Sequence, residues 1–186
     1  ILEYLKTHPE SLAARSAAKK RGDNPAIPLS TTSKVAKDPW LKKQWGMLDI
    51  EASEAWIQAK NNKTIIVGVI DSGVDYTHPD LVPNMWRNPG EIGIDSNGKN
   101  RSTNGIDDDQ NGYVDDVVGY DFVQNDALPY DKSTPMWQLA LGGGNPGHGT
   151  HCAGNIAAKG NNGLGISGVA PQAQIMALRF ISEKGS

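Results

Sequence analysis

The sequence contains a single cysteine and no long apolar segment. Because Cys152 has no second thiol to pair with, an internal disulfide is excluded, and cysteine usage leaves the redox compartment open. A run of about 18 apolar residues, which a membrane-spanning helix needs, does not occur. We therefore expect no membrane span.

Aromatic residues are also scarce, at 6% of the chain, and the net charge of -3 conceals two segments of opposite sign. Residues 1–45 contain nine Lys or Arg and four Asp or Glu. This basic segment lacks interleaved aromatic side chains, so we interpret it as solvated linker and expect no nucleic-acid partner. Residues 91–131 contain ten Asp or Glu and two Lys or Arg, an excess typical of either a solvated surface or a cation site.

Glycine and proline, in contrast, are plentiful, with 21 and 11 residues, which is typical of a turn-rich α/β protein. Prolines and a Ser/Thr cluster in residues 1–36 predict a linker or the tail of a pro-region. Residues 37–186 form the predicted folded part. Within it, residues 84–147 form an acidic insertion whose length requires a stabiliser or a function.

The apolar pattern predicts a parallel sheet. The β-branched run Ile65–Ile70 predicts a strand buried on both faces, and Gln174–Phe180 predicts a second strand. Between them, His148–Ala158 predicts a helix with small residues facing inward; Ile50–Lys60 predicts a further short helix. A strand, a helix and a strand in this order indicate a parallel crossover. Functional sites in such sheets lie at the carboxyl ends of strands, where Asp71 is placed.

Two residues have the chemistry of an acid–base pair. Asp71, followed by Ser72 and Gly73, can be held by backbone donors, as an acid that orients an imidazole requires; the alternative is a turn aspartate that caps a strand. His148, between two glycines at a predicted helix start, can act as general base and then general acid; the alternative is a structural histidine. A metal site at His148 and His151 is disfavoured, since their spacing is three and no glutamate is near.

Four segments in a fixed order carry a family resemblance: Val69–Asp75, His78–Leu81, Gly147–Gly154 and Gly168–Pro171. The chain resembles the subtilisin-like serine proteases, or subtilases. The resemblance implies an α/β fold, the parallel-sheet, three-layer subtilisin-like fold, incomplete in this chain. It implies that residues 37–186 are the N-terminal part of the catalytic domain. It further implies peptide-bond hydrolysis by an Asp-His-Ser triad, with Asp71 as orienting acid and His148 as general base.

The family's serine segment, which reads like Gly-Thr-Ser-Met-Ala, is absent. The serines after His148 are Ser167, Ser182 and Ser186, and none follows that pattern. We therefore expect this chain to be inactive alone and the serine to lie in a missing or separate C-terminal chain of the same protease. The alternative function is a catalytically inactive subtilase-like binding or chaperone protein.

The resemblance places Gly185 and Ser186 at an edge that pairs with extended peptide substrates. An exposed Gly-Ser loop is also a site of nicking, so we expect an autoprocessing cut there, with a truncated gene product as the alternative. A pro-region or an inhibitor is a further possible partner. Cys152 resembles a cysteine of the proteinase K branch, and we expect it to be a buried packing residue.

The acidic insertion contains a calcium-loop pattern, D-x-[DN]-x-[DN]-G, over residues 107–112. Asp107, Asp109 and Asn111 would provide side-chain oxygens and Tyr113 a carbonyl. Val118 replaces the usual glutamate, and Asp115 or Asp116 could substitute for it. The alternatives are an acidic loop without an ion or, for the whole chain, a calcium-binding module without catalytic ancestry. Glu91 is a weaker candidate ligand.

The resemblance implies a second calcium site beside the histidine helix. There Asp80 and Asn162 would provide side-chain oxygens, and Gly160, Leu164 and Ile166 would provide carbonyls. The alternative is an ordinary Asn-Gly turn. Two calcium sites favour a secreted or cell-surface location, where calcium is millimolar.

Overall fold

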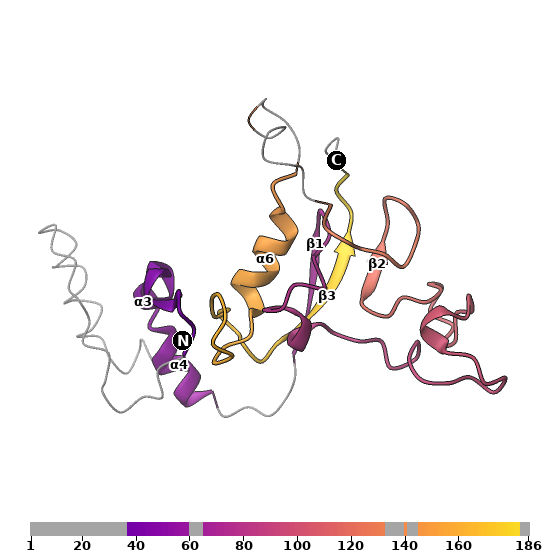
Figure 1. Cartoon of the computed structure of the whole chain (residues 1–186), viewed down its shortest axis with the longest axis horizontal. Helices are drawn as coiled ribbons and strands as arrows, with labels where there is room; N and C mark the ends of the chain where they lie inside the picture. The colour runs from indigo at the N-terminus through magenta and orange to yellow at the C-terminus, as the bar shows by residue number, and fades with distance from the viewer. Residues whose placement is uncertain (1–36, 60–64, 133–139, 141–144, 183–186) are drawn as a thin grey trace, which may run out of the picture. The chain divides into compact units, whose positions relative to one another are not determined.

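The computed structural model describes residues 37–59, 65–132, 140 and 145–182 (Figure 1). The predicted linker, residues 1–36, lies outside the described residues. Chain contacts divide the described part into a small unit, residues 44–59, and a larger unit formed by the rest. None of the described helices has the length and apolar character needed to cross a bilayer.

The small unit contains two short helices, α3 (Trp45–Asp49) and α4 (Ala52–Gln58). Between them Glu51 adopts a left-handed backbone conformation with a φ of 54°, which interrupts the helical path. The helix predicted over Ile50–Lys60 is present as α4, with Ala59 as its C-terminal cap.

The larger unit is built on a three-stranded parallel sheet in the order β1-β3-β2 (Figure 1). Strand β1 (Ile66–Asp71) pairs with β3 (Gln174–Arg179) in a register that sets Asp71 opposite Arg179. Strand β2 (Gly119–Asp121) pairs with the other edge of β3. The two predicted strands and their parallel pairing are confirmed. Strand β2 was not predicted, because three residues that include a glycine give no strand periodicity.

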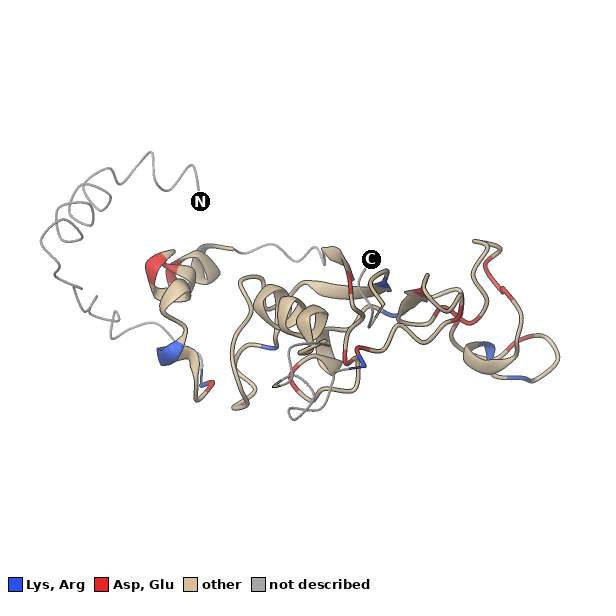
Figure 2. Ribbon diagram, turned by 90° about the horizontal axis from the view of Figure 1, so that it is seen from above, with Lys and Arg blue, Asp and Glu red and all other residues tan. Residues whose placement is uncertain are grey.

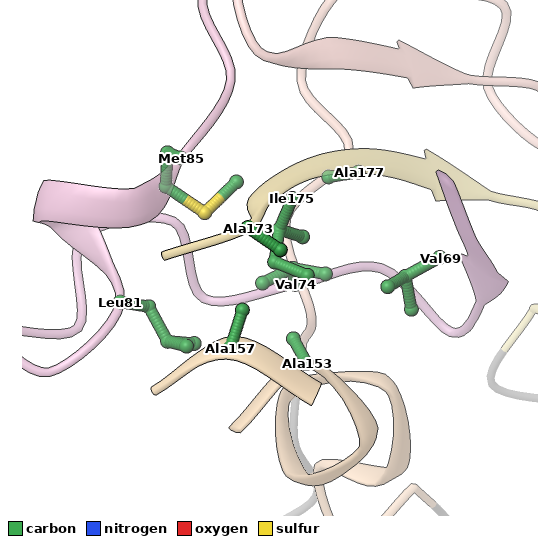
Figure 3. Close-up of a cluster of buried hydrophobic side chains, with 9 residues drawn as sticks. All are labelled: Val69, Val74, Leu81, Met85, Ala153, Ala157, Ala173, Ile175 and Ala177. Carbon is green, nitrogen blue, oxygen red and sulfur yellow. The ribbon is translucent and has the colours of Figure 1, made fainter. Parts of the chain in front are cut away.

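Helix α6 (His148–Ala157) packs on one face of this sheet. Its buried residues Gly149, Ala153 and Ala157 are four apart, so they form one stripe of small side chains. Figure 3 shows that Ala153 and Ala157 of this stripe face apolar side chains of the sheet and of the chain after β1. The buried core consists of Val69, Val74, Leu81, Met85, Ala153, Ala157, Ala173, Ile175 and Ala177.

The prediction that the first strand is buried on both faces is wrong for the described part of the chain. Val69 and Asp71 are buried, whereas Ile66 is 49% and Ile70 67% exposed. Strand side chains alternate between faces, and α6 packs on the face that carries Val69. The opposite face of β1 therefore carries apolar side chains that no element of the described residues covers fully.

The acidic insertion is mostly loop, with the short 3₁₀ helices η2 (Val82–Asn84) at its beginning and η3 (Arg101–Thr103) further on; a third, η1 (Leu41–Lys43), lies before the small unit. Figure 2 shows Asp and Glu, in red, distributed along these loops. Where the acidic insertion rejoins the sheet, at the end of β2, an ion pair connects β2 to β3. Arg179 Nη1 donates to Asp121 Oδ2 over 2.6 Å, with both residues buried.

We predict that Asp121→Asn lowers the free energy of unfolding by about 3–5 kcal/mol, because it leaves the buried Arg179 charge without its partner. Chemical denaturation of the full chain measures this difference. Asp126→Asn, in the same loop but only half-buried, is the control and should cost much less. A loss below about 1 kcal/mol for Asp121→Asn, as for an exposed pair, would contradict the prediction.

Candidate active site

The carboxyl end of β1 and the first turn of α6 bring Asp71 and His148 together. His148 Nδ1 lies 2.8 Å from Asp71 Oδ1 and 2.9 Å from Oδ2. The backbone N–H of Ser72 donates to Asp71 Oδ1 over 2.7 Å. The two residues selected from sequence, 77 positions apart, are therefore in direct contact.

This contact determines which imidazole nitrogen is available for chemistry. An ionised carboxylate only accepts hydrogen bonds, so Nδ1 must carry the proton that it donates to Asp71. Nε2 is then unprotonated in the neutral ring and can accept a proton. The His148 side chain is 65% exposed, so a substrate group can reach it.

The environment of Asp71 favours its charged form. Partial burial raises the pKa of the carboxyl, but the Ser72 N–H and the contact with His148 outweigh it, and the net pKa is below the usual value. Asp71 is thus ionised at neutral pH. An ionised acid behind Nδ1 orients the ring and stabilises the imidazolium that forms when Nε2 accepts a proton.

A second buried carboxylate, Asp131, links the end of β1 to the first turn of α6. Its Oδ1 accepts from Ser72 Oγ at 3.1 Å and from the Asn145 side-chain amide. Its Oδ2 accepts from Thr150 N at 3.0 Å and Thr150 Oγ1 at 2.6 Å. Ser72 Oγ in turn accepts from Gly149 N at 3.0 Å. Sequence reasoning missed Asp131, because it lies in the acidic insertion, where no pattern distinguishes it from its neighbours.

Glycine is required where helix and strand end meet. A Cβ on Gly149 would lie 2.1 Å from the carbonyl oxygen of Gly73, far inside contact distance. Gly147, which precedes the helix, has a φ of 85°, a conformation that other residues rarely adopt. The glycines on both sides of His148 therefore allow α6 to pack closely against the end of β1.

Cys152 lies one helical turn after His148, with its Sγ 3.8 Å from His148 Nδ1. It is half-buried and packs against the core, rather than fully buried as expected. Burial, and then the Asp71 charge, raise the pKa of this thiol. The thiol is therefore protonated at neutral pH. His151, by contrast, is exposed and lies 3.2 Å from the Asn155 amide.

The structure brings Asp80 together with the loop expected to share its calcium site. Buried Asp80 accepts from the Asn162 side-chain amide at 2.7 Å and from Ile166 N at 3.1 Å. The predicted carbonyl donors Gly160 and Leu164 belong to the same loop. A Cβ on Gly165 would lie 2.5 Å from Asp80 Oδ2, so the loop closes tightly over this carboxylate.

Sequence reasoning missed Asp38, which holds this loop from the other side. Buried Asp38 accepts from the backbone N–H groups of Asn161, Asn162 and Gly163 at 2.9 to 3.2 Å. The Ser167 hydroxyl donates to it over 2.5 Å. An Asp-Pro step offers no sequence signal for contacts more than a hundred residues away.

The acidic loop brings two of its predicted ligands, Asp109 and Asp116, together and directs others to backbone N–H groups. Asp107 accepts from the backbone N–H groups of Asn111 and Gly112, while Asn111 Oδ1 accepts from Tyr113 N. Asp115 binds Gly105 N with both oxygens. Carboxylate oxygens of Asp109 and Asp116 instead converge with one from Glu91, all within 4.8 Å of one another. The predicted substrate-binding residues Gly185 and Ser186 lie outside the described residues.

Comparison with known proteins decides which family this acid–base pair belongs to. Residues 62–186 match the sequence model of the subtilase family, Peptidase_S8. The chain belongs to the subtilase family. Its fold agrees, since a solved protease from Pseudoalteromonas arctica superimposes with a TM-score of 0.51 at 23% identity, over 81% of this chain and 40% of that one.

Curated relatives of this subtilase are proteases. Subtilisin-like protease 1 of Plasmodium berghei is 34% identical over 149 residues, which are 79% of this chain and 21% of the relative. Thermitase of Thermoactinomyces vulgaris is 34% identical over 150 residues, 80% of this chain and 38% of the relative. The sequence thus spans between about a fifth and two fifths of these relatives. As a member of the subtilase family, the chain carries part of the α/β fold of these proteases.

We predict that iodoacetamide modifies Cys152 more slowly in the native chain than in the unfolded chain at about pH 8.5, where an ordinary thiol is half ionised. Asp71→Asn should accelerate the native reaction, because it removes a negative charge that opposes the thiolate. Mass spectrometry measures the rates on the one thiol present. Equal rates in the native and unfolded chains would contradict the assigned burial and charge.

Proposed function

We propose that this subtilase is a calcium-stabilised serine endopeptidase that uses Asp71 as orienting acid and His148 as general base. The observation that carries the proposal is the contact of His148 Nδ1 with both Asp71 oxygens, at 2.8 and 2.9 Å. This contact leaves Nε2 directed away from Asp71, where a nucleophile's proton can reach it.

In the proposed reaction, His148 Nε2 accepts the hydroxyl proton of a serine as that oxygen attacks the carbonyl carbon of the peptide bond. The imidazolium, stabilised by Asp71, then donates this proton to the leaving amine, and the acyl-enzyme forms. Water hydrolyses the acyl-enzyme through the same two proton transfers. Cys152 takes no part in these steps, since its raised pKa keeps the thiol protonated.

The serine and the oxyanion donors are proposed to come from a segment outside these 186 residues, the C-terminal part of the same protease. The lack of a serine segment after His148 supports this assignment. Without these groups, His148 has no nucleophile to activate, so this chain alone would be inactive. Peptide substrates would pair along Gly185 and Ser186, and a pro-region or an inhibitor would occupy the same edge.

Calcium is proposed to bind at Asp80, with Asn162 and the carbonyls of Gly160, Leu164 and Ile166. Two features support the fit: a buried carboxylate and a glycine, Gly165, that lets the loop close over it. The proposed ligand atoms are all oxygens, which hard cations such as calcium prefer. Asn162 directs its amide N–H to Asp80 in the structure, so its oxygen would have to turn toward the ion. A cation here would stabilise the loop that follows α6. A protease with such sites is expected outside the cell, secreted or on the cell surface.

The decisive experiment labels the complete protease with a fluorophosphonate, which reacts with an activated serine. We predict labelling of a residue outside the present chain, slowed at least about 10³-fold by His148→Ala. The matched control is His151→Ala, which removes an exposed histidine of the same helix and should label at the normal rate.

Labelling that is unaffected by His148→Ala would contradict the assigned general base. Absence of labelling in the correctly folded, complete protein would favour the alternative, an inactive subtilase-like binding protein. Circular dichroism on each variant establishes that the fold is intact.

A further inference from the structure

The acidic insertion gathers three carboxylates around one point. Oxygens of Glu91, Asp109 and Asp116 lie within 4.8 Å of one another. That separation is about twice a calcium–oxygen distance, so one ion can touch all three. Glu91 and Asp116 are buried.

Glu91 is the member whose bonding is incomplete. Its side chain is 0% exposed, and its Oε1 accepts from Asp108 N at 2.8 Å and Asp109 N at 3.3 Å. Its Oε2 is buried and has no hydrogen-bond partner. A fully buried carboxylate oxygen without a donor is unfavourable, and a bound cation is one way to satisfy it.

Nearby residues neutralise the three carboxylates only in part. Within the described residues none of the three has an ion-pair partner; Arg101 lies 3.7 Å from Asp108 instead. The Asn88 amide donates to Asp109 at 2.9 Å and to Asp116 at 2.6 Å. Burial, and then neighbouring carboxylates, raise the pKa values of Glu91 and Asp116 against these hydrogen bonds. The three carboxylates therefore lie close together without a cationic side chain beside them in the described part of the chain.

The backbone at Gly90 allows the close approach of Asp109. A Cβ on Gly90 would lie 2.3 Å from Asp109 Cβ and 2.6 Å from Asp109 Oδ2, so only glycine allows Asp109 to approach. Asn88 accepts Gly90 N at 3.0 Å through its own oxygen and thereby fixes the turn that presents Glu91.

We propose that Glu91, Asp109 and Asp116 bind a calcium ion that joins the turn around Glu91 to the acidic loop over residues 107–116. This proposal deepens the calcium part of the proposed function but does not depend on peptidase activity. It changes the ligand set indicated by the loop pattern. Glu91 becomes a central ligand. Asp115 is not included, since its carboxylate does not converge with the other three and accepts from Gly105 N instead.

The proposed site at Glu91 differs from the Asp80 site in how fully the protein satisfies its carboxylate oxygens. Both Asp80 oxygens accept hydrogen bonds from the protein, whereas Glu91 Oε2 accepts none. We therefore expect calcium removal to affect the insertion more strongly than the Asp80 loop.

The test compares Glu91→Gln with Asp115→Asn in the full chain. Calorimetric titration with calcium chloride gives affinity and stoichiometry, and thermal unfolding in calcium or EDTA gives the shift of the midpoint. The parent chain should gain several degrees with calcium. Glu91→Gln should lose one binding event or bind at least about tenfold more weakly, and its calcium-induced shift should shrink.

A second readout distinguishes a lost ligand from a damaged fold. In EDTA, Glu91→Gln should be at least as stable as the parent, because the new amide removes a buried charge and can donate to Asp109 or Asp116. Asp115→Asn should retain the parent's calcium response. Asp80→Asn, which changes the other candidate site, should leave the binding event assigned to Glu91 intact.

Three results would overturn the proposal: an unchanged calcium response in Glu91→Gln, a response lost equally in Asp115→Asn, or no calcium binding by the parent chain. The first and third would mean that no calcium ion is bound by Glu91. The second would restore the predicted loop as the site. If Glu91→Gln is unstable in EDTA, Asp116→Asn, titrated in the same way, decides between a lost ligand and a lost fold.

Discussion

The structure depends on the close packing of helix α6 against the carboxyl end of β1. Buried Asp131 accepts hydrogen bonds from Ser72, which follows β1, and from Thr150 in the first turn of α6. Gly149 permits the approach, because any side chain there would collide with the Gly73 carbonyl. This packing places Asp71 in contact with His148. The acid–base geometry is thus held by a buried hydrogen-bond network and not by the exposed His148 ring itself.

Other buried carboxylates also hold distant segments together by accepting hydrogen bonds. Asp38 holds the loop after α6 by three backbone N–H groups, and Asp121 pairs with Arg179 at the end of the sheet. In both cases protein donors neutralise the charge. Glu91 is different, because one of its oxygens has no protein donor. This difference singles out Glu91, among the buried carboxylates of the described residues, as the one with an oxygen that no hydrogen-bond donor satisfies.

Much of the fold that positions the site was predictable from local pattern. The apolar run before Asp71, the stripe of small residues after His148 and the run near Ile175 gave β1, α6 and β3, and their order gave the parallel pairing. The Asp71–His148 contact followed from a family resemblance, in which the two motifs are read together. Each of these features depends on the residues of one short segment, so it can be predicted from the sequence.

What could not be predicted depends on contacts between distant loops. Asp131 and Asp38 act through hydrogen bonds to residues far along the chain, and no periodicity marks them. The calcium-loop pattern left Asp115 and Asp116 as alternatives for the missing glutamate and made Glu91 a weaker candidate. Folding turned Asp115 to Gly105 and placed Glu91 beside Asp109 and Asp116. The exposure of Ile70 likewise depends on what packs on the sheet, which the alternation of residues within β1 does not specify.

The central claim is that Asp71 holds His148 in one tautomer, with the proton on Nδ1. Proton NMR of the full chain with nitrogen-labelled histidine tests it most directly. The account predicts a downfield Nδ1–H resonance from His148 that persists in His151→Ala and disappears in Asp71→Asn. A His148 ring protonated on Nε2, or a resonance that Asp71→Asn leaves unchanged, would contradict it.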